Sequence, residues 1–175
     1  MTWGLLAQVM TWGLVFLGWM LVNAQNNRRE DRKEFRSSLD RLSQRIETLL
    51  LASVQYWCSD PNTAGSADIT WEIKRNLEQV ELNINRLVRR AESNIPWHWR
   101  KTGERQLAIA ACNSRVLEAF DAWASVMTGG AFESKGRVAI TTADSPLPLI
   151  LLEANALIDR LEAAHDAFCG VKAPM

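Results

Sequence analysis

Apolar and polar residues divide the chain into an uncharged N-terminal run and a series of amphipathic segments. The run from Trp3 to Val22 contains no charged side chain. As a helix rising about 1.5 Å per residue, it would be about 30 Å long, which matches the hydrocarbon thickness of a bilayer. We therefore predict one transmembrane helix here. Any break in the helix that follows is expected in the polar stretch at residues 23–27.

Beyond this run, apolar residues recur at spacings of four and three, the period of an amphipathic helix. The predicted inward stripes are Phe35, Leu39, Leu42, Ile46, Leu49 and Tyr56; Ile73, Leu77, Val80, Ile84, Leu87 and Ala91; Leu107, Ala111, Ser114, Leu117, Phe120, Ala124 and Met127; and Leu147, Ile150, Ala154, Leu157, Leu161, Ala164 and Phe168. Four such stripes bury only against one another, and no period-two segment is long enough to build a sheet. The predicted fold is all-α, an antiparallel helical bundle behind the anchor.

Turn and capping residues set the expected helix ends. Asp68 is predicted to cap the second helix, which ends before Pro96 because the residue preceding a proline is pushed out of helical geometry. The third helix is expected over about 104–127. Ser145 is predicted to cap the fourth helix, with Pro146 in its first position.

The predicted organisation has three parts: a transmembrane anchor at residues 1–27, a membrane-proximal helix at 28–57, and a cytoplasmic bundle at 58–175 that this helix completes. The arginine-rich segment 28–36 resists translocation, which predicts a single-pass inner-membrane protein with its short N-terminus outside. The alternative is a cleaved signal peptide, since residues 22–24 resemble a small-residue cleavage site. However, no Lys or Arg precedes the apolar run, and the run is longer than the usual signal core.

One side of the predicted anchor carries small and polar residues. This stripe consists of Gly4, Gln8, Thr11, Val15, Gly18 and Val22. Transmembrane helices associate through such stripes, so we expect self-association. In a ring of such helices, the Gln8 and Thr11 side chains would face water. In the alternative, a lone anchor, both side chains bond to carbonyls of their own helix.

Charge and cysteine content narrow the function classes. Twenty Lys and Arg balance twenty Asp and Glu, so the chain has no global basic signature for nucleic acid. Cys58, Cys112 and Cys169 are odd in number and widely spaced, which suggests neither a disulfide framework nor a metal site. We predict three buried, reduced cysteines and no metal or cofactor.

A basic and aromatic loop precedes the third predicted helix. It comprises Trp97, His98, Trp99, Arg100 and Lys101. Aromatic faces beside positive charge can stack bases and hold phosphates. The same loop can instead pack its indoles into the bundle end or touch lipid headgroups, and we favour packing because one loop is not a nucleic-acid groove.

The fourth predicted helix contains an arginine followed, after four residues, by a histidine: Arg160 and His165. This spacing resembles the active-site motif of the HEPN superfamily, small helical-bundle domains that are often ribonucleases in antiviral defence. The resemblance implies that arginine binds phosphate and histidine moves the proton of a ribose 2′-hydroxyl. Five residues rotate about 500° along a helix, so the two side chains diverge by roughly 140° and two copies must meet to act on one phosphate.

Two features allow a non-catalytic interpretation of this motif. Leu161 follows the arginine where the stronger form of the motif has a polar residue, which weighs against nuclease activity more than against the fold. Arg160 can also pair with Glu153 or Asp159 on the bundle surface, with His165 as a hydrogen-bonded boundary residue.

With its anchor at the N-terminus and this motif near the C-terminus, the chain resembles the small membrane accessory proteins of type VI-B CRISPR systems. The resemblance implies an oligomeric, ring-shaped pore that depolarises the inner membrane in antiviral defence. Its expected partners are further copies of the chain, membrane lipid, and an RNA-guided CRISPR ribonuclease or an RNA signal. The alternatives are a membrane-tethered HEPN ribonuclease and a non-catalytic membrane adaptor.

Overall fold

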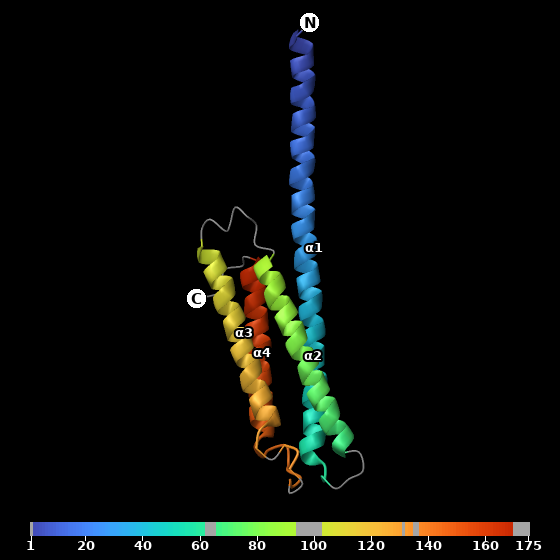
Figure 1. Ribbon diagram of the computed structural model, residues 1–175, viewed down its shortest axis with the longest axis vertical. Helices are drawn as coiled ribbons and strands as arrows, with labels where there is room; N and C mark the ends of the chain where they lie inside the picture. Colours follow the sequence, from blue (N-terminus) through green and yellow to red (C-terminus); the bar gives the residue numbers. More distant parts are fainter. Residues whose placement is uncertain (1, 62–65, 94–102, 131, 135–136, 170–175) are drawn as a thin grey trace. The chain divides into compact units, whose positions relative to one another are not determined.

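The computed structural model describes residues 2–61, 66–93, 103–130, 132–134 and 137–169, and in these residues it contains four α-helices and no strand. The helices are α1 (Thr2–Cys58), α2 (Ser66–Ser93), α3 (Glu104–Thr128) and α4 (Leu147–Cys169), shown in Figure 1. The all-α prediction is confirmed. Contacts divide the chain into two compact units, Met1–Ser37 and Ser38–Met175, with the boundary inside α1.

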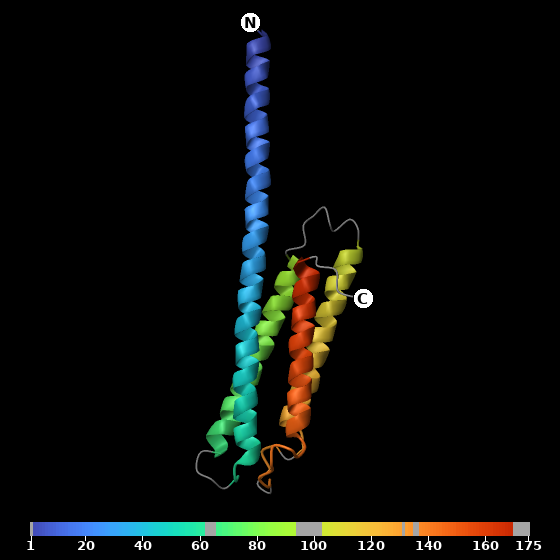
Figure 2. The same ribbon diagram turned by 180° about the vertical axis from the view of Figure 1, so that it is seen from behind.

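The second unit is a helical bundle. Its four helical segments, from Ser38 of α1 onward, run alternately in opposite directions (Figures 1 and 2), so the predicted antiparallel bundle is confirmed. The most extensive close contacts between backbones are those of α3 with α4. Alanine lets helix backbones approach closely, and Ala154 of α4 is completely buried.

The predicted stripes of α1 and α2 are confirmed, because every residue named in them is at most 8% exposed. Ser53, which interrupts the apolar pattern of α1, is also buried, and its hydroxyl donates a hydrogen bond of 2.8 Å to the Leu49 carbonyl. A buried hydroxyl with such a partner avoids most of its desolvation cost. In α4, the stripe is buried from Leu147 to Leu161, whereas Ala164 and Phe168 are only partly buried.

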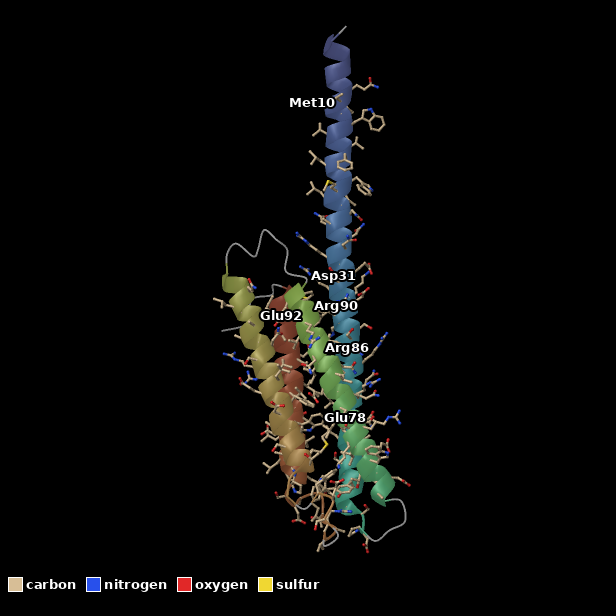
Figure 3. All side chains as sticks on the ribbon, in the orientation of Figure 1. Met10, Asp31, Glu78, Arg86, Arg90 and Glu92 are labelled. Atoms are coloured by element: carbon tan, nitrogen blue, oxygen red, sulfur yellow. The ribbon has the colours of Figure 1, made fainter. Side chains whose placement is uncertain are left out.

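The predicted stripe of α3 is wrong in its first half. Leu107 is 72% exposed, and Ala111 and Ser114 are exposed as well. Phe120 and Met127 of the predicted stripe are buried, and the other buried residues of α3 are Ile109, Asn113, Val116 and Trp123. Asn113 adds a polar residue to this face, but its Nδ2 donates a 3.2 Å hydrogen bond to Glu92 Oε1. Glu92 lies at the end of α2, where Figure 3 labels it. An amide whose hydrogen-bonding groups are paired can be buried. Because apolar residues occur on both faces of α3, the sequence did not decide which face is buried.

Helix ends differ from the predictions by a few residues. The first helix continues without a break through residues 23–27. Helix α2 begins at Ser66, two residues before the predicted cap Asp68. Helix α4 begins at Leu147, and the Pro146 carbonyl accepts a hydrogen bond of 2.9 Å from Ile150 N. Because this bond is the first of the helix, Pro146 takes the capping position that was predicted for Ser145.

The N-terminal part of α1 presents apolar side chains to its surroundings. Side chains are described from Gln8 onward, and the large apolar ones from Val9 to Val22 are 50% to 69% exposed. Among the described residues, no helix holds an apolar stretch of the length and hydropathy that a membrane span requires. The side chains at 3–7, where the predicted anchor begins, lie outside the described ones.

The turn before α4 is held by Asp144. Its carboxylate accepts hydrogen bonds from the Thr141 hydroxyl (2.6 Å) and the Thr141 backbone N–H (3.1 Å). These two bonds, the hydroxyl first, hold the pKa of Asp144 below its ordinary value. The stabilisation is present when the carboxyl is ionised and is lost as the pH falls through this lowered pKa.

The buried face of α3 can be tested with a pair of truncations. Ile109→Ala is expected to lower the free energy of unfolding by about 2–5 kcal/mol, because it leaves a cavity at a residue that is 4% exposed. Leu107→Ala, on the exposed face of the same helix, should change it by less than about 0.5 kcal/mol. Guanidinium unfolding of the full chain in detergent, followed by circular dichroism, measures both. Equal losses would contradict the observed face.

The hydrogen bond at the turn predicts a pKa change. Thr141→Val removes the hydroxyl donor, so the pKa of Asp144 should rise toward its ordinary value. A carbon-13 NMR titration of the Asp144 carboxyl measures it. Thr142→Val, the neighbouring threonine, is the matched control and should leave this pKa unchanged. If both variants titrate like the wild type, the hydroxyl bond is not formed in solution.

Candidate functional site

The two residues of the predicted motif lie on α4 but have different surroundings. The Arg160 side chain is exposed and forms no hydrogen bond or ion pair within the described part of the chain. The His165 side chain is 16% exposed, and its Nε2 lies 3.4 Å from the Cys169 Sγ. Its other ring nitrogen, Nδ1, lies 3.4 Å from the Asp166 carboxylate. Arg160 and His165 are therefore not joined by any bond in this chain.

This environment bears on the chemistry the motif can perform. An exposed guanidinium is able to bind a phosphate, and an imidazole is able to move a proton. Neighbouring copies of α4 would have to meet for both groups to reach one phosphate, because the two side chains diverge around one helix. Their catalytic roles stay a prediction.

The contact between His165 and Cys169 was not anticipated from the sequence. A spacing of four residues puts two side chains on one face of a helix, so the signal was present. An imidazole beside a thiol can accept its proton and leave the more reactive thiolate. All three cysteines are free thiols, but Cys58 is exposed and the other two are partly exposed, so the prediction of buried cysteines is wrong. In amphipathic helices, spacing decides exposure more strongly than residue type.

The other predicted site residues fall in two groups. Gln8 and Thr11 are exposed on the N-terminal part of α1. Trp97, His98, Trp99, Arg100 and Lys101 lie outside the described residues.

A buried arginine that packs against the end of α1 is a feature that the sequence analysis did not identify. Arg137 lies in the connection between α3 and α4 and is 4% exposed. Its Nη1 donates hydrogen bonds to the carbonyls of Tyr56 (2.5 Å) and Trp57 (3.3 Å), in the last turn of α1. Its guanidinium carbon lies 4.2 Å from the centre of the Tyr56 ring and 5.9 Å from that of Trp57. Helix carbonyls and aromatic faces both attract a cation, and they hold this one in place.

Further contacts fix the connection to α1 and α2. Tyr56 Oη accepts a 2.9 Å hydrogen bond from the Glu133 backbone N–H, and the Glu133 carboxylate pairs with Lys74 of α2 at 2.5 Å. Ile140 N donates to the Trp57 carbonyl at 3.1 Å. These contacts link the connection to helices that lie more than fifty residues earlier in the chain. The described residues of the predicted long connection, residues 131–144, therefore pack against α1 and α2.

A cavity of about 530 Å³ that is open to solvent lies beside this arginine. Its lining residues come from α1, the end of α3 and the connection: Trp57, Ser125, Val126, Gly129, Gly130, Arg137, Val138, Ile140, Ser145 and Pro146. Gly129 is required there, because a Cβ would stand 2.6 Å from the Ser125 carbonyl oxygen. Two buried donors on lining residues, Trp57 Nε1 and Arg137 Nη2, have no hydrogen-bond partner within the described part of the chain. Each such group costs about 1–3 kcal/mol.

Within the described residues, no group of three or more His, Cys, Asp and Glu side chains is arranged to hold a metal ion. Neither a protein-family model, nor a curated protein, nor a solved structure matches this chain.

The contact between His165 and Cys169 predicts a difference in thiol reactivity. His165→Gln removes the proton acceptor, so alkylation of Cys169 by iodoacetamide should slow several-fold at neutral pH. Peptide mass spectrometry measures the rate at each cysteine. Exposed Cys58 is the internal control, and its rate should not change. An unchanged rate at Cys169 would show that the imidazole does not take the thiol proton.

Proposed function

We propose that this chain is an oligomeric membrane protein that permeabilises or depolarises the inner membrane in CRISPR-associated antiviral defence. The observation that carries the proposal is the apolar surface of α1 between Val9 and Val22, where large side chains are 50% to 69% exposed. Side chains project from several sides of the helix around Met10 (Figure 3). A helix with large apolar side chains on several sides requires apolar surroundings.

Lipid and further copies of the chain are the surroundings we infer. The uncharged run in sequence extends back to Trp3, which gives it the length of a bilayer span. The arginine-rich segment at 28–36 follows directly and supports an orientation with the bundle in the cytoplasm. Basic side chains next to a membrane also interact with anionic headgroups.

Gln8 and Thr11 are the residues we assign to the pore. They are exposed polar side chains three residues apart, so they share one side of a helix that is otherwise apolar. In a ring of helices, this side would face water and the apolar sides would face lipid. A signal from an RNA-guided ribonuclease or from RNA would open the path.

The bundle is proposed to be HEPN-like, with Arg160 and His165 serving assembly or signal sensing. Exposed Arg160 is available to another molecule, whereas His165 is occupied with Cys169 and Asp166. The spacing of the two residues favours a second candidate function, a membrane-tethered ribonuclease. A non-catalytic adaptor is the third candidate, and it predicts neither ion flux nor RNA cleavage.

The pore is tested first by mass and then by ion flux. Native mass spectrometry of the detergent-solubilised chain should show one discrete assembly of several subunits. In vesicles containing this assembly, changing Gln8 and Thr11 together to Leu should abolish ion flux, because the path loses its polar lining. His165→Ala should retain the flux.

Met10→Leu is the matched control in the same helix and should conduct like the wild type. A monomer, or flux that survives the loss of both polar residues, contradicts the pore. A dimer that cleaves RNA and loses this activity in His165→Ala would establish the tethered ribonuclease instead.

A further inference from the structure

We propose that the cavity beside Arg137 binds a small organic oxyanion, a phosphate monoester or a carboxylate with an apolar body. The cavity lies where the end of α1, the end of α3 and the connection to α4 meet. Three observations point to this ligand class. No carboxylate pairs with Arg137 in the described residues, two buried donors have no acceptor there, and the cavity has the size and lining of a small-molecule site.

Arg137 is a buried cation that lacks an anionic partner. Its bonds go to the carbonyls of Tyr56 and Trp57, and no Asp or Glu pairs with it in the described part of the chain. The Glu133 carboxylate, in the same connection, pairs with Lys74 instead. Carbonyl dipoles and aromatic faces compensate a positive charge only in part, so an anion that enters here gains a strong partner.

Two donors on residues of the cavity lining have no acceptor among the described residues. Arg137 Nη2 and Trp57 Nε1 are both buried, and neither has a hydrogen-bond partner there. A guanidinium presents parallel N–H groups that match the oxygens of a phosphate or carboxylate. Because the two nitrogens are shielded from solvent, binding requires a small rotation of the Arg137 side chain toward the ligand. Ser125 and Ser145 are exposed polar residues of the same lining.

The size and chemistry of the cavity favour a small organic molecule over a bare ion or a polymer. Its volume of about 530 Å³ is in the range of small-molecule sites. Val126, Ile140, Pro146 and Trp57 line it, so an apolar body has apolar walls to lie against while the oxyanion faces the arginine. This combination of apolar walls and a few polar groups is typical of ligand pockets.

Phenyl phosphate is the probe we choose, because it combines an aromatic body with a phosphate monoester. Isothermal titration of the full chain in detergent should show binding of phenyl phosphate and weaker binding of inorganic phosphate. Phenol, which lacks the charge, should not bind. Arg137→Gln should weaken the binding of phenyl phosphate by at least about tenfold, and Arg137→Lys, which keeps the charge but loses the paired donors, by less.

A second variant separates binding from folding, since Arg137 also holds the connection in place. Ser125→Trp fills the cavity and leaves the Arg137 bonds intact, so it should abolish binding. Ser114→Trp, on the exposed face of the same helix, is the matched control and should bind normally. The proposal is overturned if no binding is detected up to about 10 mM phenyl phosphate. It is also overturned if phenol binds equally well, or if Ser125→Trp binds like the wild type.

Discussion

The need to cover apolar helix surface is the constraint on which this structure depends. Covering such surface is worth about 25 cal/mol per Å², so a stripe of six or seven large side chains decides where a helix can lie. Helix α1 meets this need in two ways. From Leu39 to Tyr56, its stripe is buried in the bundle unit. From Val9 to Val22, its apolar side chains are exposed, and an apolar surface of this extent is typical of sites that contact lipid or other proteins.

The bundle also has to accommodate one buried charge. The carbonyls that end a helix lack partners within it, and the negative end of the helix dipole lies there. Arg137 supplies a donor and a positive charge at this point, through the carbonyls of Tyr56 and Trp57. The same contact anchors the connection from α3 to α4 on α1. Burying Arg137 in this way leaves its charge surrounded by carbonyl dipoles and aromatic rings, without a carboxylate partner in the described residues. Because these groups compensate the charge only in part, the neighbouring cavity is expected to prefer an anion.

Much of the fold was predictable from the sequence, whereas less of the candidate site was. The stripes of α1 and α2 were found residue by residue because their opposite faces are polar. In α3, apolar residues occur on both sides, and the polar residue Asn113 on the inner face weakened the amphipathic pattern. Its burial is explained by its hydrogen bond to Glu92, which the sequence does not reveal. Arg137 gave no sequence signal, since its partners are backbone carbonyls some eighty residues away, and any residue type can supply a carbonyl. His165 and Cys169 are four residues apart, so their contact was available to the same spacing rule that identified the stripes.

The positions of Arg160 and His165 mean that any chemistry at this motif depends first on how copies of the chain assemble. Arg160 is exposed and His165 is mostly buried beside Cys169, so one copy of α4 does not present both groups to one phosphate. A ribonuclease built on this motif therefore needs two copies in contact, and a pore needs several. These two functions differ in what the assembled copies enclose: a shared phosphate site between α4 helices, or a water-filled path between α1 helices. The number of subunits consequently discriminates between the functions more directly than the loss of either motif residue does, because removing His165 also breaks its contact with Cys169.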